Sequence, residues 1–445
     1  MPTPAHDRLR SELHPPLSSH EARVESARCY FCHDAPCVTA CPTGIDVPLF
    51  IRQIATDRKK GAARTIFDEN IFGGMCARVC PTETLCEAAC VRNVAEDRPV
   101  RIGELQRFAT DSLMGEAVHP YARAEASGRR VAVVGAGPAG LSCAHRLARH
   151  GHAVRVFDSL PKPGGLNEYG IAAYKAVDDF AQAEVDWLLS IGGIELCHDT
   201  VLGVDVTLES LKREYDAVFV GLGLGATNAL DIDGHDLAGV EDAIDFIARL
   251  RQTDDLGTLA PGRRVVVVGG GMTAIDAAVQ SKLLGAEEVS VVYRRDASLM
   301  NASEYERELA QTSGVTIRTG LAPRRVHGEG GVVTGIEFDY VAASGNALEP
   351  TGETLLIPCD RVLKAIGQLF VTHPNGEALA LEGRRISVDE ERRTSDPMVW
   401  AGGDCASSGE DLTVWAVQDG KLAAESIHRA LGAASRNAAS EAATR

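Results

Sequence analysis

Residues 129–158 read RRVAVVGAGPAGLSCAHRLARHGHAVRVFD, which places a glycine-rich turn between a short apolar strand and a helix, followed by a second strand. Gly135 permits a tight turn, Gly137 lets the backbone approach a pyrophosphate, and Gly140 lets the helix pack closely on the strand. The helix N-terminus offers free N–H groups to an anion. Asp158 ends the second strand, where a carboxylate can bind ribose hydroxyls or simply be solvated. This order predicts a Rossmann-like unit for FAD or NAD.

Residues 263–295 repeat the same order in RRVVVVGGGMTAIDAAVQSKLLGAEEVSVVYRR. The second strand ends in Arg294 and Arg295 instead of an acidic residue. Guanidinium groups at this position can bind a 2′-phosphate, which favours NADPH over NADH, although two solvated arginines are the alternative. The residues expected to bind this nucleotide are Gly269, Gly271, Thr273, Ala274, Arg294 and Arg295.

Two further stretches favour FAD at the first glycine loop. Gly165 and Leu166 follow the first unit, and the glycine lets the backbone run close to a ligand. Residues 399–427 place Gly403-Asp404 between a strand and a helix, and two-dinucleotide flavoproteins commonly hold the ribityl chain with this Asp. A helix that begins near Thr413 would direct its N-terminus at the flavin pyrimidine ring. The expected FAD residues are Gly135, Gly137, Ala139, Gly140, Asp158, Gly165, Leu166, Gly403, Asp404, Thr413 and Val414.

Eight of the twelve cysteines lie in two bursts, spaced Cys29-x2-Cys32-x4-Cys37-x3-Cys41-Pro and Cys76-x3-Cys80-Pro-x4-Cys86-x3-Cys90. The first burst is similar to the ferredoxin run C-x2-C-x2-C-x3-C-P, in which the fourth cysteine ligates the other of two clusters. The spacing therefore predicts two neighbouring [4Fe–4S] clusters, which suit a flavin that receives electrons in pairs. Structural zinc is the competing explanation, but His33 is the one histidine inside a burst.

The fold class expected is α/β, with two Rossmann-like dinucleotide-binding domains preceded by an α-helical iron–sulfur domain. The KAIGQ stretch at 364–368 returns the chain to the first nucleotide domain, so the second domain is inserted in the first. The expected boundaries are 1–125 for the helical double [4Fe–4S] domain, 126–255 and 365–445 for the two parts of the FAD domain, and 256–364 for the NAD(P)H domain. Residues 1–20 are expected to form a loose leader.

Charge and hydropathy exclude several classes of function. The net charge of −17 disfavours a nucleic-acid binder, because phosphate backbones require a basic face. No apolar run approaches the length of a membrane span, and the N-terminus lacks a signal-peptide pattern. These features predict a cytoplasmic protein, in which disulfides are a poor explanation of the cysteine bursts.

The motifs CHDAPC, CARVCPTETLCEAAC, IGELQRFATD, GAGPAG, GGGMTA and AGGD occur in this order over about residues 20–430. In this order the chain resembles the flavin/iron–sulfur subunit of bacterial dihydropyrimidine dehydrogenases and the N-terminal half of the animal enzyme. It is more distantly similar to the glutamate synthase small subunit. It departs from the family pattern at Asn301, where a proline is usual, and in NEYGIAAYK at 167–175, where Ile-Pro-x-Phe-Arg is usual.

The resemblance implies ligands that the spacing alone leaves open. It assigns one cluster to Cys29, Cys32, Cys37 and Cys90, and the other to Cys41, Cys80, Cys86 and Gln106. Cys76 would then be a buried non-ligand, and the alternative is that all eight cysteines are ligands.

The resemblance also implies the activity and the partner. The chain would pass electrons from NAD(P)H through FAD and two [4Fe–4S] clusters to an FMN- and iron–sulfur-bearing subunit. That hetero-oligomeric partner would reduce uracil or thymine to the 5,6-dihydropyrimidine. Hydride transfer would occur at the FAD, so no side chain is expected to be catalytic. The alternatives are a glutamate synthase small subunit, a freestanding NAD(P)H:ferredoxin-type oxidoreductase, and a zinc-binding scaffold.

Overall fold

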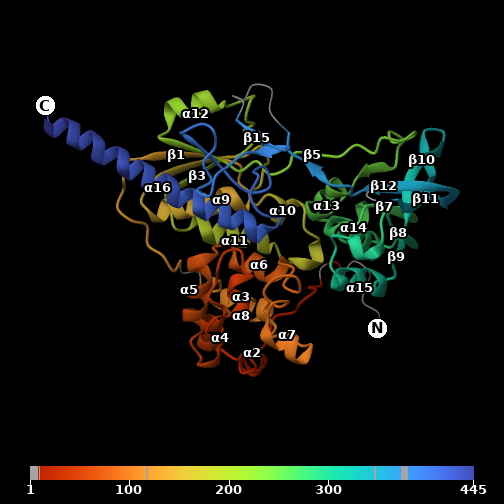
Figure 1. Ribbon diagram of the computed structural model, residues 1–445, viewed down its shortest axis with the longest axis horizontal. Coiled ribbons are helices and arrows are strands. Elements are labelled where there is room, and N and C mark those ends of the chain that lie inside the picture. The colour runs from red at the N-terminus through yellow and green to blue at the C-terminus, as the bar shows by residue number, and fades with distance from the viewer. Residues whose placement is uncertain (1–8, 10, 117–118, 345–346, 372–378, 445) are drawn as a thin grey trace. The chain divides into compact units, whose positions relative to one another are not determined.

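The computed structural model describes residues 9, 11–116, 119–344, 347–371 and 379–444 (Figure 1). The chain divides into two compact units. One unit comprises residues 14–168, 179–225 and 370–445, and it holds both cysteine bursts and the first glycine loop. The other comprises residues 1–13, 169–178 and 226–369, and it holds the second glycine loop. We call them the flavin unit and the nicotinamide unit, after the cofactor that the sequence predicts for each glycine loop.

The flavin unit begins with helices, as the sequence predicts. Local caps fix several of them: Ser18 and Glu21 form a capping box on α2, and Asp46 accepts a hydrogen bond from the N–H of Leu49 at the start of α4. Phe50, Phe67 and Phe72 are almost fully buried among these helices and form much of their core. The helices are α2 (Ser19–Ser26), α3 (Pro36–Thr39), α4 (Val47–Ala55), α5 (Lys59–Glu69), α6 (Gly73–Val79), α7 (Val91–Glu96) and α8 (Ile102–Met114).

A parallel five-stranded sheet forms the rest of the flavin unit, with strand order β17-β4-β1-β2-β3. Three of its strands contain continuous buried apolar runs, VAVV at 131–134, AVFV at 217–220 and VWA at 399–401, which is typical of a sheet covered by helices on both faces. The strands are β1 (Arg130–Val134), β2 (Ala153–Phe157), β3 (Ile194–Cys197), β4 (Ala217–Val220) and β17 (Val399–Ala401). The helices used below are α9 (Pro138–Arg149), α10 (Leu166–Tyr169), α11 (Phe180–Leu189) and α16 (Thr413–Thr444).

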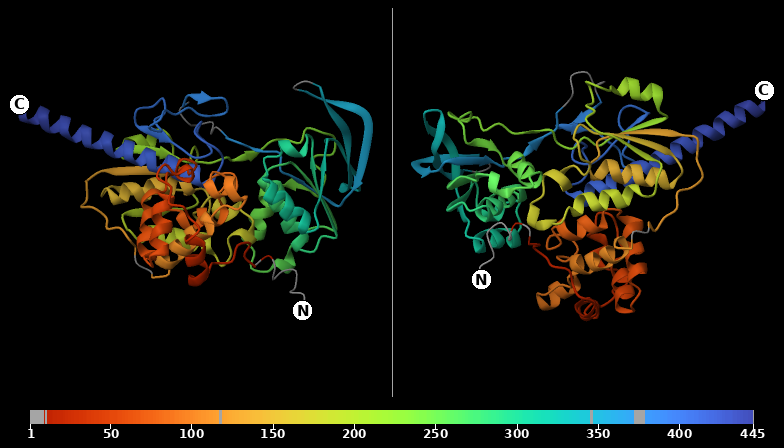
Figure 2. Two further views of the ribbon diagram at one scale, coloured as in Figure 1. Left: turned by 60° about the horizontal axis from the view of Figure 1, so that its bottom comes forward. Right: turned by 180° about the vertical axis from the view of Figure 1, so that it is seen from behind.

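The nicotinamide unit holds a second parallel sheet, with strand order β6-β13-β7-β8-β9. An antiparallel sheet of β10, β11 and β12 forms a curved ribbon beside it (Figure 2). The strands are β6 (Val240–Asp242), β7 (Arg264–Val268), β8 (Glu288–Tyr293), β9 (Thr316–Thr319), β10 (Leu321–Glu329), β11 (Val332–Ser344), β12 (Ala347–Pro358) and β13 (Arg361–Lys364). The helices are α13 (Ala243–Arg251), α14 (Met272–Leu283) and α15 (Glu304–Thr312). Two parallel sheets confirm the predicted fold class.

The N-terminal segment differs from the expected loose leader. Leu9 is 1% exposed and belongs to the apolar core of the nicotinamide unit. The N–H of Leu13 donates to the carbonyl of Tyr174, at 2.8 Å. Leu9 is buried in that core and Leu13 packs against it, which holds this part of the leader in place, whereas residues 1–8 and 10 lie outside the described residues.

The compact units also group residues 169–178 with 226–369, although the motifs alone suggested a boundary near 255.

Candidate functional site

The first glycine loop joins β1 to α9, and the sequence pattern is explained by what surrounds each glycine. Gly135 has a positive φ of 103°, and a Cβ there would lie 2.1 Å from the carbonyl oxygen of Gly221. A Cβ on Gly140 would lie 1.9 Å from the carbonyl oxygen of Gly135. At Gly137, by contrast, the nearest atom to an added Cβ is the Cα of Gly165, at 3.8 Å. Contacts with the protein backbone therefore require glycine at positions 135 and 140. At Gly137 the lack of a side chain instead leaves space beside the N-terminus of α9.

Asp158 and Gly165 lie at this same edge of the sheet. Asp158 accepts hydrogen bonds from the N–H of Ala136 (2.5 Å) and the N–H of Leu160 (2.8 Å), so its carboxylate also holds the glycine loop. Gly165 has a positive φ of 55°, and a Cβ there would lie 2.9 Å from the Cα of Gly137. The two glycine backbones thus run side by side, with Leu166 next in the chain. The cradle fits a pyrophosphate because neither glycine has a side chain to fill it.

The downstream stretch reaches the same loop from β17. The N–H of Gly403 donates to Oδ2 of Asp419 at 2.8 Å, and a Cβ on Gly403 would lie 3.0 Å from the Cβ of Ala139. Burial raises the pKa of Asp404 to about 7, and the nearby charge of Asp411 adds to this shift. The hydroxyl of Thr413, the first residue of α16, donates to Oδ1 of Asn167 at 2.8 Å. The predicted FAD residues, which run on to Val414, therefore converge from four separate segments.

The second glycine loop, in the nicotinamide unit, also combines a glycine required by a backbone contact with a glycine that leaves open space. Gly269 has a φ of 147°, and a Cβ there would lie 2.1 Å from the carbonyl oxygen of Ala365. Gly271 has no atom within 4 Å of an added Cβ, so space remains at the N-terminus of α14, whose first turns contain Thr273 and the fully buried Ala274. This loop too fits a dinucleotide pyrophosphate.

Arg294 and Arg295 follow directly after β8, beside this loop. Both are exposed, and within the described residues neither side chain forms an ion pair with the protein. Tyr293 packs against Gly270, where a Cβ would lie 2.5 Å from its ring, and its hydroxyl donates to the carbonyl of Leu299. The two guanidinium groups are thus available to a ligand that binds at the end of β8.

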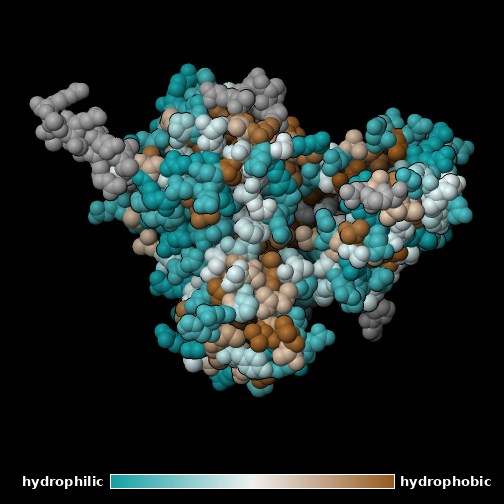
Figure 3. All heavy atoms as spheres, viewed as in Figure 1, coloured by the Kyte–Doolittle hydropathy of each residue, from teal (hydrophilic) through white to brown (hydrophobic). Residues whose placement is uncertain are grey.

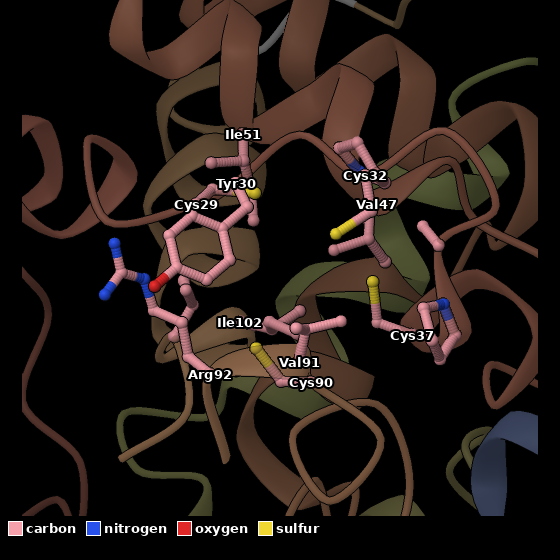
Figure 4. Close-up of a pocket in the computed structure, with 14 residues that line it drawn as sticks. Cys29, Tyr30, Cys32, Cys37, Val47, Ile51, Cys90, Val91, Arg92 and Ile102 are labelled. Atoms are coloured by element: carbon pink, nitrogen blue, oxygen red, sulfur yellow. The ribbon is translucent and has the colours of Figure 1, made fainter. Parts of the chain in front are cut away.

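Four of the predicted cluster ligands line one pocket in the helical part. Cys29, Cys32, Cys37 and Cys90 surround it, and Figure 4 shows the thiols of Cys32, Cys37 and Cys90 directed into the same space. The rest of the lining is largely apolar and includes Val47, Ile51, Val91 and Ile102. Burial raises the pKa of Cys37 to about 12 and also raises that of Cys29. These thiols stay protonated at neutral pH unless metal binding removes the proton.

The remaining candidate ligands form a second group on neighbouring elements. A hydrogen bond with Cys76 and burial raise the pKa of Cys80 well above its ordinary value, and the charges of Cys41 and Cys86 act in the same direction. Gln106 on α8 is 8% exposed, and its Nε2 donates to the carbonyl of Gly73 at 2.7 Å. Cys76 is 2% exposed and lies against Cys80. Cys76 therefore lies within α6, and Gln106 is hydrogen-bonded to the first residue of that helix.

The four-cysteine pocket offers one thiol from each of four cysteines. In a [4Fe–4S] cluster each thiolate binds a different iron, so four thiols around a pocket are an appropriate donor set.

Two buried carboxylates, Glu184 and Asp419, were not predicted from the sequence. Glu184 on α11 is fully buried and accepts hydrogen bonds from the N–H groups of Gly74 and Met75, at 2.8 and 3.1 Å. Burial raises the pKa of Glu184 to about 8, against the opposing effect of those hydrogen bonds. Asp419, also fully buried, holds the N–H of Gly403. In the sequence, each of these carboxylates is only an acidic residue within a helix. Such a residue does not indicate which N–H group its carboxylate binds.

Exposed apolar side chains lie around the four-cysteine pocket. Tyr30 and Val91 line the pocket and are 52% and 39% exposed, and Val94 on α7 is 88% exposed. Figure 3 shows hydrophobic residues gathered on this helical part of the flavin unit. Such a patch is typical of an interaction surface.

Comparison with known proteins decides the family. Residues 129–420 match the family described as pyridine nucleotide-disulphide oxidoreductase. The chain belongs to this oxidoreductase family. Residues 7–118 match a second family, described as dihydropyrimidine dehydrogenase domain II, 4Fe-4S cluster.

Two curated relatives match this oxidoreductase over nearly their whole length. The chain is 38% identical to the NAD-dependent dihydropyrimidine dehydrogenase subunit PreT of Escherichia coli K12, over 94% of this chain and 97% of that one. It is 34% identical to the glutamate synthase [NADPH] small chain of the same organism, over 94% and 93% of the two chains. Its fold is similar to that of Mycobacterium tuberculosis FprA in complex with NADPH, with a TM-score of 0.57 and 20% identity over 70% of this chain and 86% of that one.

These matches confirm the cofactor classes and the kind of enzyme. The chain is an NAD(P)H-dependent flavin oxidoreductase with an N-terminal 4Fe–4S domain, and its cofactors are FAD, NAD(P)H and 4Fe–4S. Within the residues that the structure describes, no helix is both long and apolar enough to cross a membrane.

Proposed function

We propose that this oxidoreductase is the electron-input subunit of a cytoplasmic dihydropyrimidine dehydrogenase. It would take electrons from NAD(P)H and deliver them to an FMN- and iron–sulfur-bearing partner subunit, which reduces uracil or thymine to the 5,6-dihydropyrimidine. The observation that carries the proposal is the match to a dihydropyrimidine dehydrogenase subunit over 94% of this chain and 97% of the relative. The four-cysteine pocket in the same compact unit as the first glycine loop supports it.

The residues have distinct proposed roles. When bound, FAD accepts electrons in pairs from NAD(P)H, and iron–sulfur clusters carry them onward singly. Gly135, Gly137, Gly165 and Asp404 hold the FAD, and the first turn of α16 faces the flavin. We assign one cluster to the pocket of Cys29, Cys32, Cys37 and Cys90. We assign a second cluster to Cys41, Cys80, Cys86 and Gln106.

The partner would dock at the apolar patch around the four-cysteine pocket. Tyr30, Val91 and Val94 are exposed there, and burying them against a second protein would bring its redox centre near the cluster. Electron transfer between proteins requires this proximity.

The choice of nicotinamide cofactor is assigned to Arg294 and Arg295. Their exposed guanidinium groups at the end of β8 fit the 2′-phosphate of NADPH. We expect Arg294→Ala/Arg295→Ala to raise the KM for NADPH about ten-fold or more while leaving the KM for NADH within about two-fold. Equal changes for both dinucleotides would show that these arginines do not read the 2′-phosphate.

The proposed function is tested with the anaerobically reconstituted chain and an FMN- and iron–sulfur-bearing pyrimidine-reducing subunit. Oxidation of NADH and of NADPH is followed with and without uracil or thymine, and Gly271→Val serves as the control that cannot bind the dinucleotide. Pyrimidine-dependent oxidation is the expected result. A chain that reduces an artificial dye but shows no pyrimidine-dependent oxidation with either dinucleotide would contradict the assignment. Activity with a glutamate synthase large chain would support the rival assignment instead.

A further inference from the structure

A buried side chain that no motif marks joins two of the segments assigned to the flavin. Asn167 follows Gly165-Leu166 and is 1% exposed. Its Oδ1 accepts a hydrogen bond from the hydroxyl of Thr413 at 2.8 Å, and its own N–H donates to the carbonyl of Gly164 at 3.2 Å. One residue therefore connects the glycine loop at 164–165 to the start of α16.

Only one of the two polar atoms in the Asn167 side-chain amide has a hydrogen-bond partner in the protein. Nδ2 of Asn167 is buried and has no hydrogen-bond partner among the described residues. A buried donor without a partner costs about 1–3 kcal/mol, and an apolar residue of similar size would avoid that cost. Stability alone therefore does not explain an asparagine here, which points to a role for its contact with Thr413.

Thr413 occupies a position where orientation affects the cofactor. It is the first residue of α16, and the first N–H groups of a helix have no partner within the helix. Together with the helix dipole, these groups stabilise negative charge placed at the N-terminus. The hydrogen bond from the Thr413 hydroxyl to Asn167 holds this first residue of the helix in one orientation relative to the segment that carries Gly165.

We propose that Asn167 is a positioning residue for the flavin. It acts through Thr413 to fix the first turn of α16 against the glycine loop at 164–165. This inference rests on the proposed FAD site, but it does not depend on the pyrimidine partner. Its test therefore uses the purified FAD-loaded chain and reads out flavin binding and flavin potential, which remain measurable if the pyrimidine assignment fails.

The test compares Asn167→Leu, Thr413→Val, the double variant and Thr413→Ser, which keeps the hydroxyl. We expect each of the first two variants to bind FAD about five-fold more weakly, the value of one net hydrogen bond. The flavin midpoint potential should become more negative, because negative charge on the reduced flavin is less well stabilised. The double variant should be no worse than either single variant, and Thr413→Ser should match the wild type.

A purely structural role predicts a different pattern, which the FAD-free protein reveals. We expect the double variant to unfold at the same temperature as the wild type or higher, because it removes the unpaired Nδ2 donor together with both groups of the Asn167–Thr413 hydrogen bond. Amide hydrogen exchange of Ala416, whose N–H donates to the carbonyl of Leu412 at the start of α16, should nevertheless be faster in both single variants. The proposal is overturned if Asn167→Leu leaves FAD affinity and flavin potential unchanged. It is also overturned if the two single losses multiply in the double variant.

Discussion

Lys175→Met should destabilise the nicotinamide unit strongly, because this lysine forms ion pairs with two buried carboxylates. Its Nζ lies 2.8 Å from Oδ1 of Asp276 and 3.0 Å from Oε1 of Glu306, and the three side chains are 12%, 6% and 7% exposed. Burial opposes the charged lysine, but the charges of Asp276 and Glu306 outweigh this effect and raise its pKa. Removing one partner of a buried ion pair costs about 3–5 kcal/mol, because the remaining charge stays desolvated.

Hydrogen exchange is the appropriate measurement, because all three tryptophans, Trp187, Trp400 and Trp415, lie in the flavin unit and do not report on this one. Peptides from β7 and β8 should exchange roughly 100- to 5000-fold faster in Lys175→Met at neutral pH.

Two control variants make this result interpretable. Arg263→Met breaks an ion pair with Glu287 at 2.6 Å whose side chains are 71% and 59% exposed, and exposed pairs contribute about 1 kcal/mol or less. A triple variant, Lys175→Met with Asp276→Asn and Glu306→Gln, removes the buried charges together and should recover part of the loss. Exchange in Lys175→Met within about three-fold of Arg263→Met would refute the reasoning.

Three further predictions concern the ligand sites, the partner surface and pH. Gly271→Val should fold normally and lose dinucleotide binding in a titration, since only open space surrounds an added Cβ; unchanged binding would contradict the assignment of this loop. Val94→Glu, at an 88% exposed position, should weaken partner-dependent activity while leaving dye reduction intact. Burial and the charge of His428 lower the pKa of His152 to about 4. The unfolded chain therefore binds the extra proton more readily, and stability should fall by up to about 3 kcal/mol as the pH drops from about 6.5 to 4. Tryptophan-monitored urea unfolding at several pH values tests this, and His152→Asn should flatten the dependence.

The glycine loops could be predicted from sequence because each position has a local steric reason. Gly135 must avoid the carbonyl of Gly221, and Gly269 that of Ala365, so the pattern records backbone contacts within one βαβ unit. The cysteine bursts gave the cluster chemistry for a similar reason, since thiol spacing within one short segment limits which ligands meet. The four thiols around one pocket are the grouping that the family resemblance implied.

The long-range contacts could not be predicted, because no periodicity connects them. Glu184 meets the start of α6 across more than a hundred residues, and Asn167 meets Thr413 across a still longer interval. Leu9 was assigned to a loose leader because its surroundings are polar, yet a single leucine buried in the core of another segment is enough to order it. A polar residue in such a contact has the same sequence signature as a solvated one.

An anaerobic reductive titration of the isolated chain tests the central claim most directly. The account predicts that NAD(P)H or an equivalent donor transfers two electrons to FAD and one to each of two [4Fe–4S] clusters. Each chain should therefore take up four electrons. Electron paramagnetic resonance should then show two interacting reduced clusters, and Cys90→Ser should abolish or alter one of them. Uptake of only two electrons per chain, with no cluster signal in a preparation of full iron content, would contradict the account.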